Sequence, residues 1–179
     1  MIKRLLSTLA GVSLAVAAVA PAAVAQDAAS MRAMRFGVEG GLSMPTGDVG
    51  DFLGMGFLIG GLMDIMPANW PVAIRANLDY QRWGYDEDVA DGESSSMISV
   101  TGDAMFAIPT TSGIRPYVLG GLGIYRTDCS FECDASNDLG FNFGGGLNFN
   151  LGALDTHVEA RYHSVDDSSF IPVVFGIRF

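Results

Sequence analysis

Charged residues that could do chemistry recur inside apolar segments of this sequence, each at an alternate position. They are Glu39, Asp64, Arg75, Asp79, Asp103, Glu159, Arg161 and Arg178. If the fold encloses them, they could line a gated polar path or a proton-coupled pore. They could equally form an internal network of ion pairs, because buried charges must be paired. We expect the ion-pair network, since the segments that carry them predict a narrow, filled interior.

A histidine, a serine and an acid lie together at His163-Ser164-Val165-Asp166. Nucleophilic catalysis would require these side chains to converge. On a strand, however, neighbouring side chains point to opposite faces, so Ser164 would face away from His163. No other Ser-His-acid arrangement is evident. The sequence therefore predicts neither catalytic residues nor a cofactor, and the chain is not expected to be an enzyme.

Cys129 and Cys133 are the two cysteines of the chain. A metal site would need further ligands, and no histidine lies close in sequence. The first residues predict export into an oxidising compartment, where a disulfide across this short span is favoured.

The N-terminus has the pattern of a cleavable signal peptide. Lys3 and Arg4 precede an apolar run from Leu5 to Ala20, and Ala23-Val24-Ala25 is a cleavage motif before Gln26. A membrane anchor is the alternative, which Pro21 and the short apolar run disfavour. We expect a signal peptide at 1–25, a short periplasmic segment at 26–34 and one domain at 35–179.

The mature chain would be strongly acidic. Cleavage removes Lys3 and Arg4 but none of the twenty acidic residues, and the whole chain already has a formal net charge of −10. Without a basic surface the protein is not expected to bind nucleic acid.

Eight segments show apolar and polar residues in alternation, separated by turns or acidic clusters. Their approximate ranges are 35–44, 55–66, 71–83, 96–108, 117–126, 139–151, 156–165 and 170–179. After Ala25 no apolar run reaches about 18 residues, which a helical span would need. Alternation over about ten residues is typical of transmembrane β-strands, with one face toward lipid and the other toward the lumen. The sequence thus predicts an all-β, eight-stranded antiparallel up-and-down barrel with both termini on the periplasmic side.

Two details of this pattern stay open. In the fifth segment Val118, Leu122 and Ile124 are placed toward lipid, although Leu119 and Tyr125 fall on the opposite face. Trp83 breaks the apolar alternation of the third segment, so it marks either a bulge or a position beyond the bilayer. Aromatic residues near strand ends predict interfacial girdles; they are Trp70, Tyr80, Trp83, Tyr85, Tyr117 and Tyr162.

The connections differ in charge. Those after the first, third, fifth and seventh segments are acidic, whereas the others are rich in Pro, Gly and Thr, as expected of extracellular loops and periplasmic turns. The densest acidic set is Asp86-Glu87-Asp88 with Asp91. It could bind Ca²⁺ but lacks the spacing of an EF-hand. We expect no dedicated metal site, only a solvated surface that shares the divalent cations of lipopolysaccharide.

The closing segment from Phe170 to Phe179 resembles the last strand of outer-membrane barrels. Glu159-Ala160-Arg161-Tyr162-His163, Arg115-Pro116-Tyr117-Val118 and Gly120-Gly121-Leu122-Gly123 also resemble the outer-membrane β-barrel domain family. This family includes small barrels of Gram-negative bacteria similar to the membrane domain of outer membrane protein A and to outer membrane protein X. The resemblance covers nearly all of residues 33–179.

The resemblance implies a location in the bacterial outer membrane after export through the periplasm. It implies outer-membrane lipid, lipopolysaccharide and the barrel-assembly machinery as partners, with Phe175, Ile177 and Phe179 as the assembly signal. Outer-membrane lipid A deacylases of similar architecture use a His-x-Ser dyad, which His163-Ser164 does not match.

The predicted function is therefore a structural or surface-interaction role, with the lumen filled by side chains. The alternative is a narrow, porin-like channel for small or apolar solutes, and a lipid-modifying enzyme is less favoured. A soluble, lipocalin-like barrel would instead turn its apolar faces inward. We expect a monomer, because a closed barrel has no free strand edge.

Overall fold

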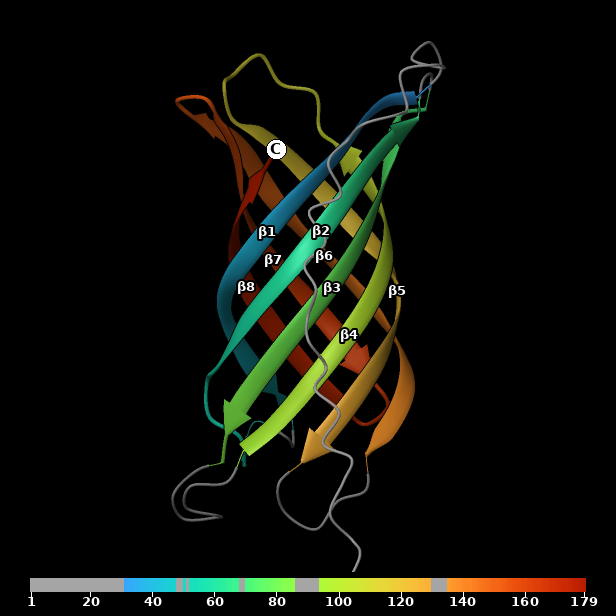
Figure 1. The fold of residues 1–179 in the computed structure, drawn as a ribbon, viewed down its shortest axis with the longest axis vertical. Coiled ribbons are helices and arrows are strands. Elements are labelled where there is room, and N and C mark those ends of the chain that lie inside the picture. The colour runs from blue at the N-terminus through green and yellow to red at the C-terminus, as the bar shows by residue number, and fades with distance from the viewer. Residues whose placement is uncertain (1–30, 48–49, 51, 68–69, 86–93, 130–134) are drawn as a thin grey trace, which may run out of the picture.

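The computed structural model describes residues 31–179 except 48–49, 51, 68–69, 86–93 and 130–134, and it describes no side chains at 31–33 and 129. Its strands are β1 (Met31–Thr46), β2 (Gly56–Pro67), β3 (Val72–Gly84), β4 (Ser94–Ala107), β5 (Arg115–Cys129), β6 (Ser136–Leu151), β7 (Leu154–Val165) and β8 (Ser168–Arg178). Each strand pairs antiparallel with the next, and β8 pairs with β1 to close the barrel (Figure 1). Within the described ranges, no helix has the length and apolar character that a membrane span requires.

The predicted eight-stranded antiparallel barrel is confirmed, although several strands are longer than predicted. β1 begins at Met31 instead of Arg35, and β6 begins at Ser136 instead of Leu139. Backbone pairing needs no apolar side chain, so the hydrogen-bonded ladder continues past the apolar stretch from which each strand was predicted. The β1–β2 register shifts once, between Arg32 and Met34.

Large apolar side chains lie on the outside of the barrel. Leu78, Leu122 and Phe143 are 58%, 70% and 55% exposed, while the polar side chains between them are buried. Only a lipid surrounding makes such a surface favourable over so much of a closed sheet. The soluble, lipocalin-like interpretation is therefore wrong.

The strand register and the burial of the side chains show which residues of β5, and whether Trp83 of β3, face the lumen. On β5, Val118, Leu122 and Ile124 face outward, while Leu119 and Tyr125 are buried in the lumen. Trp83 pairs in register with Ser95 and is 3% exposed.

Trp83 and Tyr117 therefore belong to the lumen, and the prediction that placed them in interfacial girdles is wrong. Position 83 follows 75, 77, 79 and 81, so Trp83 keeps the inward alternation of the polar residues rather than breaking the outward one. No bulge is needed at this position.

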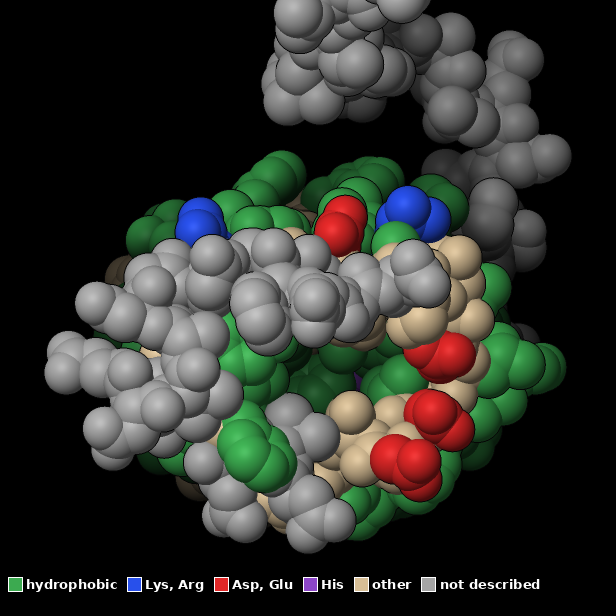
Figure 2. All heavy atoms as spheres, turned by 90° about the horizontal axis from the view of Figure 1, so that it is seen from below, with side chains coloured by type: hydrophobic (Ala, Val, Ile, Leu, Met, Phe, Trp, Pro, Cys, Tyr) green, Lys and Arg blue, Asp and Glu red, His purple; other side chains and the backbone are tan. Residues whose placement is uncertain are grey.

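The two ends of the barrel differ in the connections they carry (Figure 1). We call the end where β1 starts and β8 finishes the terminal end, and the opposite end the loop end. The loop end carries the connections that follow β1, β3, β5 and β7. Described acidic residues at that end include Asp128, Asp138, Asp166 and Asp167, which lie at or beyond strand ends. Acidic side chains lie along one side of a hollow with apolar walls when the barrel is viewed from there (Figure 2).

Candidate functional site

The eight charged residues singled out in the sequence all lie inside the barrel, and none is more than 7% exposed. They come from β1, β2, β3, β4, β7 and β8. The strict alternation of each strand turns them inward, because their neighbours in sequence point to lipid. We call the ion-paired members and their direct partners the lumen network.

Arg75 is the centre of the network toward the terminal end. It is completely buried, and its guanidinium donates two hydrogen bonds to Asp64, at 2.6 and 2.9 Å, and one to Glu159 at 2.7 Å. Tyr117 donates its hydroxyl to Glu159 at 2.5 Å, and Arg75 lies 5.6 Å above the Tyr117 ring. The cation is thereby satisfied by two carboxylates and one aromatic face.

Arg161 is the centre of the network in the middle of the lumen. It donates to Glu159 and, at 3.1 Å, to Asp103, and it lies 4.0 Å from Glu39. Two neutral side chains complete this region. Asn142 donates to Asp103 at 2.9 Å, and Asn77 donates to Glu39 at 3.0 Å.

Arg178 connects this network to the terminal end. It contacts Asp64 and Asp155, each at 3.2 Å, and donates to Asn148. Asp155 also accepts a hydrogen bond from Arg35 at 2.7 Å.

Asp79 is the member of the predicted set that the structure does not bring into an ion pair. It is 3% exposed, and within the described part of the chain no basic group lies within 4.0 Å of it. It borders a cavity of about 10 Å³ that Glu39, Arg161 and His163 also line. Such a space holds about one water molecule.

The barrel has one pocket at its terminal end and one at its loop end, and the lumen network lies between the two pockets. The terminal-end pocket has a volume of about 250 Å³ and is lined by Arg35, Arg115, Asp155 and Arg178. The loop-end pocket has a volume of about 260 Å³ and is lined by Trp83, Met97, Phe170 and polar residues of the rim.

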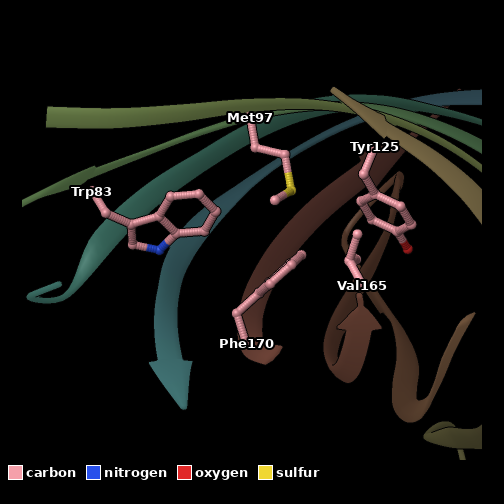
Figure 3. Close-up of a cluster of buried hydrophobic side chains, with 5 residues drawn as sticks. All are labelled: Trp83, Met97, Tyr125, Val165 and Phe170. Atoms are coloured by element: carbon pink, nitrogen blue, oxygen red, sulfur yellow. The ribbon is translucent and has the colours of Figure 1, made fainter. Parts of the chain in front are cut away.

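Below the loop-end pocket lies a cluster of buried apolar side chains, formed by Trp83, Met97, Tyr125, Val165 and Phe170 (Figure 3). Trp83 and Phe170 meet edge to face, with ring centroids 5.5 Å apart. Gly56 makes room for the indole, since a Cβ there would lie 2.4 Å from Cδ1 of Trp83.

Sequence reasoning missed this cluster and several network partners. His157 contacts Glu39 through Nε2 at 3.0 Å, and Tyr117, Asn77 and Asn142 also belong to the network. His157 and Asn77 alternate in phase with the predicted lumen charges on β7 and β3. Tyr117 and Asn142 lie on β5 and β6, which carry none of those charges, but they are next to the outward-facing Val118 and Phe141. Strand parity could have placed them in the lumen, although not beside particular partners.

His163 is part of the lumen packing. Its Nδ1 lies 2.8 Å from the Tyr125 hydroxyl, and its ring stacks on Phe170 at 4.8 Å. Ser164 lies on the opposite face of β7, paired with Ser169 of β8. The two neighbours do not form a His-Ser dyad.

The other predicted sites are placed as follows. The signal cleavage residues Ala25 and Gln26, Cys133 of the candidate disulfide, and the acidic set at 86–91 lie outside the described residues, as does the side chain of Cys129. Phe175 and Phe179 face outward and Ile177 is half-buried at the β8–β1 seam. Among the described residues, no three His, Cys, Asp or Glu side chains form a group suited to a metal ion.

Comparisons with known proteins agree with this architecture. Among solved structures, the chain is similar to Neisserial surface protein A, with a TM-score of 0.63 and 16% identity over 83% of this chain and 97% of that one. It is similar to the N-terminal β-barrel domain of Pseudomonas aeruginosa OprF, with a TM-score of 0.52 and 15% identity over 81% and 97%. It is also similar to the outer membrane enzyme PagL, with a TM-score of 0.52 and 14% identity over 82% and 99%.

At these identities the three structures support the fold alone. No curated protein matches the sequence. The model of the family described as "Outer membrane protein beta-barrel domain" matches residues 12–176. The chain therefore belongs to the outer membrane protein β-barrel domain family, which agrees with its lipid-facing surface and closed sheet.

Proposed function

We propose that this protein is a closed barrel of the bacterial outer membrane with a structural or surface-interaction role carried by its loop end. The observation that supports a closed barrel most strongly is the lumen network, in which Arg75, Arg161 and Arg178 are each held by carboxylates inside the barrel. An eight-stranded barrel has an interior just wide enough for side chains to fill. A solute would have to break these pairs in order to pass, and breaking a buried pair is costly.

The competing proposal is a narrow channel for small or apolar solutes, and planar-bilayer conductance separates the two. We expect the refolded protein to give no steady conductance, because the charged side chains occupy the space that ions would cross. Folding of each preparation is checked by the shift in gel mobility on heating, and a wide-lumen porin serves as the positive control. A reproducible ohmic conductance that scales with the amount of folded barrel would contradict the closed lumen.

An enzymatic role finds little support in the geometry around His163. PagL shares the fold, but His163 is hydrogen-bonded to Tyr125 and stacked on Phe170 inside the lumen. We expect mass spectrometry of lipid A incubated with the folded protein to show unchanged acyl chains, both for the natural chain and for His163→Ala. Acyl loss that disappears in His163→Ala would establish the enzyme instead.

The proposed location carries further expectations. The loop end would face outward, toward lipopolysaccharide and its divalent cations, and the barrel would be exported and remain monomeric. The outward-facing Phe175 and Phe179, with Ile177, would be read by the barrel-assembly machinery, and Cys129 with Cys133 would form a disulfide.

A further inference from the structure

The loop-end pocket combines features that a filled barrel mouth does not need. We propose that it binds a small organic cation that carries an oxygen hydrogen-bond acceptor, the chemistry that choline represents. The inference rests on the proposed function in one respect, since that function places the loop end outside the cell. Binding itself depends only on the pocket.

Part of the apolar lining of the pocket is aromatic. Trp83, Tyr85 and Phe170 all line the pocket. The ring planes of Trp83 and Phe170 make an angle of 62°, so the two rings pack edge to face. Aromatic faces attract organic cations through the ring quadrupole, and tryptophan does so most strongly. Groups of aromatic side chains around one space are typical of sites for quaternary ammonium ions.

Trp83 also carries a buried hydrogen-bond donor. The residue is 3% exposed, and its indole Nε1 has no hydrogen-bond partner among the residues that the structure describes. A buried donor without a partner costs free energy, so such groups are rare unless they have a use. The nitrogen lies on the edge of the ring directed toward the end where the β1 arrow finishes, which is the loop end (Figure 3). A ligand oxygen in the pocket would satisfy it.

Carboxylates on the rim set the sign of the ligand's charge. Asp138 and Asp166 both line the pocket, and none of the described residues that line it is basic. Asp138 accepts a hydrogen bond from Ser136 at 2.7 Å, which orients its carboxylate. Acidic side chains border the hollow in the view from the loop end (Figure 2). Clefts lined by one sign of charge raise the local concentration of the opposite sign.

The volume of the pocket and its place at the loop end restrict the choice of ligand further. A pocket of about 260 Å³ lies just below the usual range for drug-sized ligands, so it suits a molecule of a few heavy atoms. The terminal-end pocket has a similar volume, but three arginines (Arg35, Arg115 and Arg178) line it against two carboxylates (Asp64 and Asp155), so its net positive charge disfavours a cation. The proposed specificity therefore belongs to the loop end.

The fluorescence of Trp83 allows a direct test. The variant Trp70→Phe leaves Trp83 as the sole tryptophan, and it is titrated with choline in dodecyl maltoside, because phosphocholine and amine-oxide detergents would compete. The neutral matched ligand is 3,3-dimethylbutan-1-ol, which keeps the shape and the hydroxyl but lacks the charge. Isothermal titration calorimetry on the natural chain provides a second readout that does not depend on tryptophan.

Two rim substitutions and one matched control accompany the titration. Asp138→Asn with Asp166→Asn removes both rim charges and keeps their size; asparagine also tolerates the positive φ of 49° at position 166. Asp167→Asn removes a neighbouring acidic charge that does not line the pocket. Gel mobility verifies that each variant is folded.

We expect choline to give a saturable fluorescence change and binding heat, about tenfold weaker after the double rim substitution and unchanged in Asp167→Asn. The neutral alcohol should bind at least tenfold more weakly than choline. The proposal is overturned if neither readout detects choline, if the alcohol binds equally well, or if Asp167→Asn weakens binding as much as the double rim substitution. None of these results alters the conductance test, so failure of the pocket and failure of the closed barrel are distinguishable.

Discussion

Replacing Arg75 by methionine is expected to destabilise the folded barrel by about 3–5 kcal/mol, the usual cost of removing one partner from a buried ion pair. The substitution leaves Asp64 with Arg178 alone and takes a close cation from Glu159, while both carboxylates stay buried. Methionine fills much of the space of the arginine stem, so the loss reports mainly on the charge.

The measurement is the free energy of unfolding in urea, followed by tryptophan fluorescence in lipid vesicles. Arg35→Met is the matched control, because Arg35 also pairs with a carboxylate but has a side chain that is 41% exposed. An exposed pair contributes about 0–1 kcal/mol. Equal effects of the two substitutions would show that the lumen network does not stabilise the barrel as we describe.

Gly41→Ala is expected to cost about 3 kcal/mol of stability, at the upper end of what overpacking costs. Gly41 lies on β1 at the seam with β8, and a Cβ there would lie 2.0 Å from the backbone oxygen of Val173 and 2.7 Å from Cα of Val174. Backbone atoms cannot rotate away as a side-chain end can, so the last strand would have to move from the first.

The folded fraction after dilution from urea into detergent, read from heat-modifiable gel mobility, measures this effect. Gly102→Ala is the control, since Gly102 is also on a strand of the barrel but a Cβ there would meet no heavy atom within 4 Å outside its chain neighbours. Folding of Gly41→Ala to the level of Gly102→Ala would mean that the β1–β8 seam accommodates the added methyl group.

The alternation of side chains explains why much of this fold could be predicted. A strand has a side-chain period of two, so one lipid-facing residue such as Leu78 places Arg75, Asn77 and Asp79 in the lumen. The same rule was misapplied to Trp83, because an aromatic residue near a strand end was assigned to the membrane interface. Trp83 has an odd residue number like the lumen residues Arg75, Asn77 and Asp79 of β3, and this alternation places it correctly in the lumen.

Partner choice inside the lumen could not be predicted in the same way. Which residues meet across the barrel depends on the stagger of all eight strands, which alternation within one strand does not contain. The contact between Glu39 on β1 and His157 on β7, 118 positions apart, is one example. Asp79 is another, since its sequence context is like that of the paired carboxylates and yet it forms no ion pair among the described residues.

The cluster of buried apolar side chains below the loop-end pocket could not be predicted, for a related reason. Trp83, Met97 and Phe170 come from three different strands, and alternation within one strand does not show which residues of other strands each of them meets. Their convergence appears only when β3, β4 and β8 are closed into one sheet.

Osmotic water permeability tests the closed lumen most directly, because water is smaller than any solute that a narrow channel would carry. Stopped-flow light scattering would compare lipid vesicles that contain the folded barrel with empty vesicles of the same lipid and size. We predict the same rate of shrinkage for both, since the lumen network separates the two end pockets and leaves a cavity of about 10 Å³ beside Asp79. Shrinkage that accelerates in proportion to the amount of folded barrel would reveal a continuous water path and contradict the account.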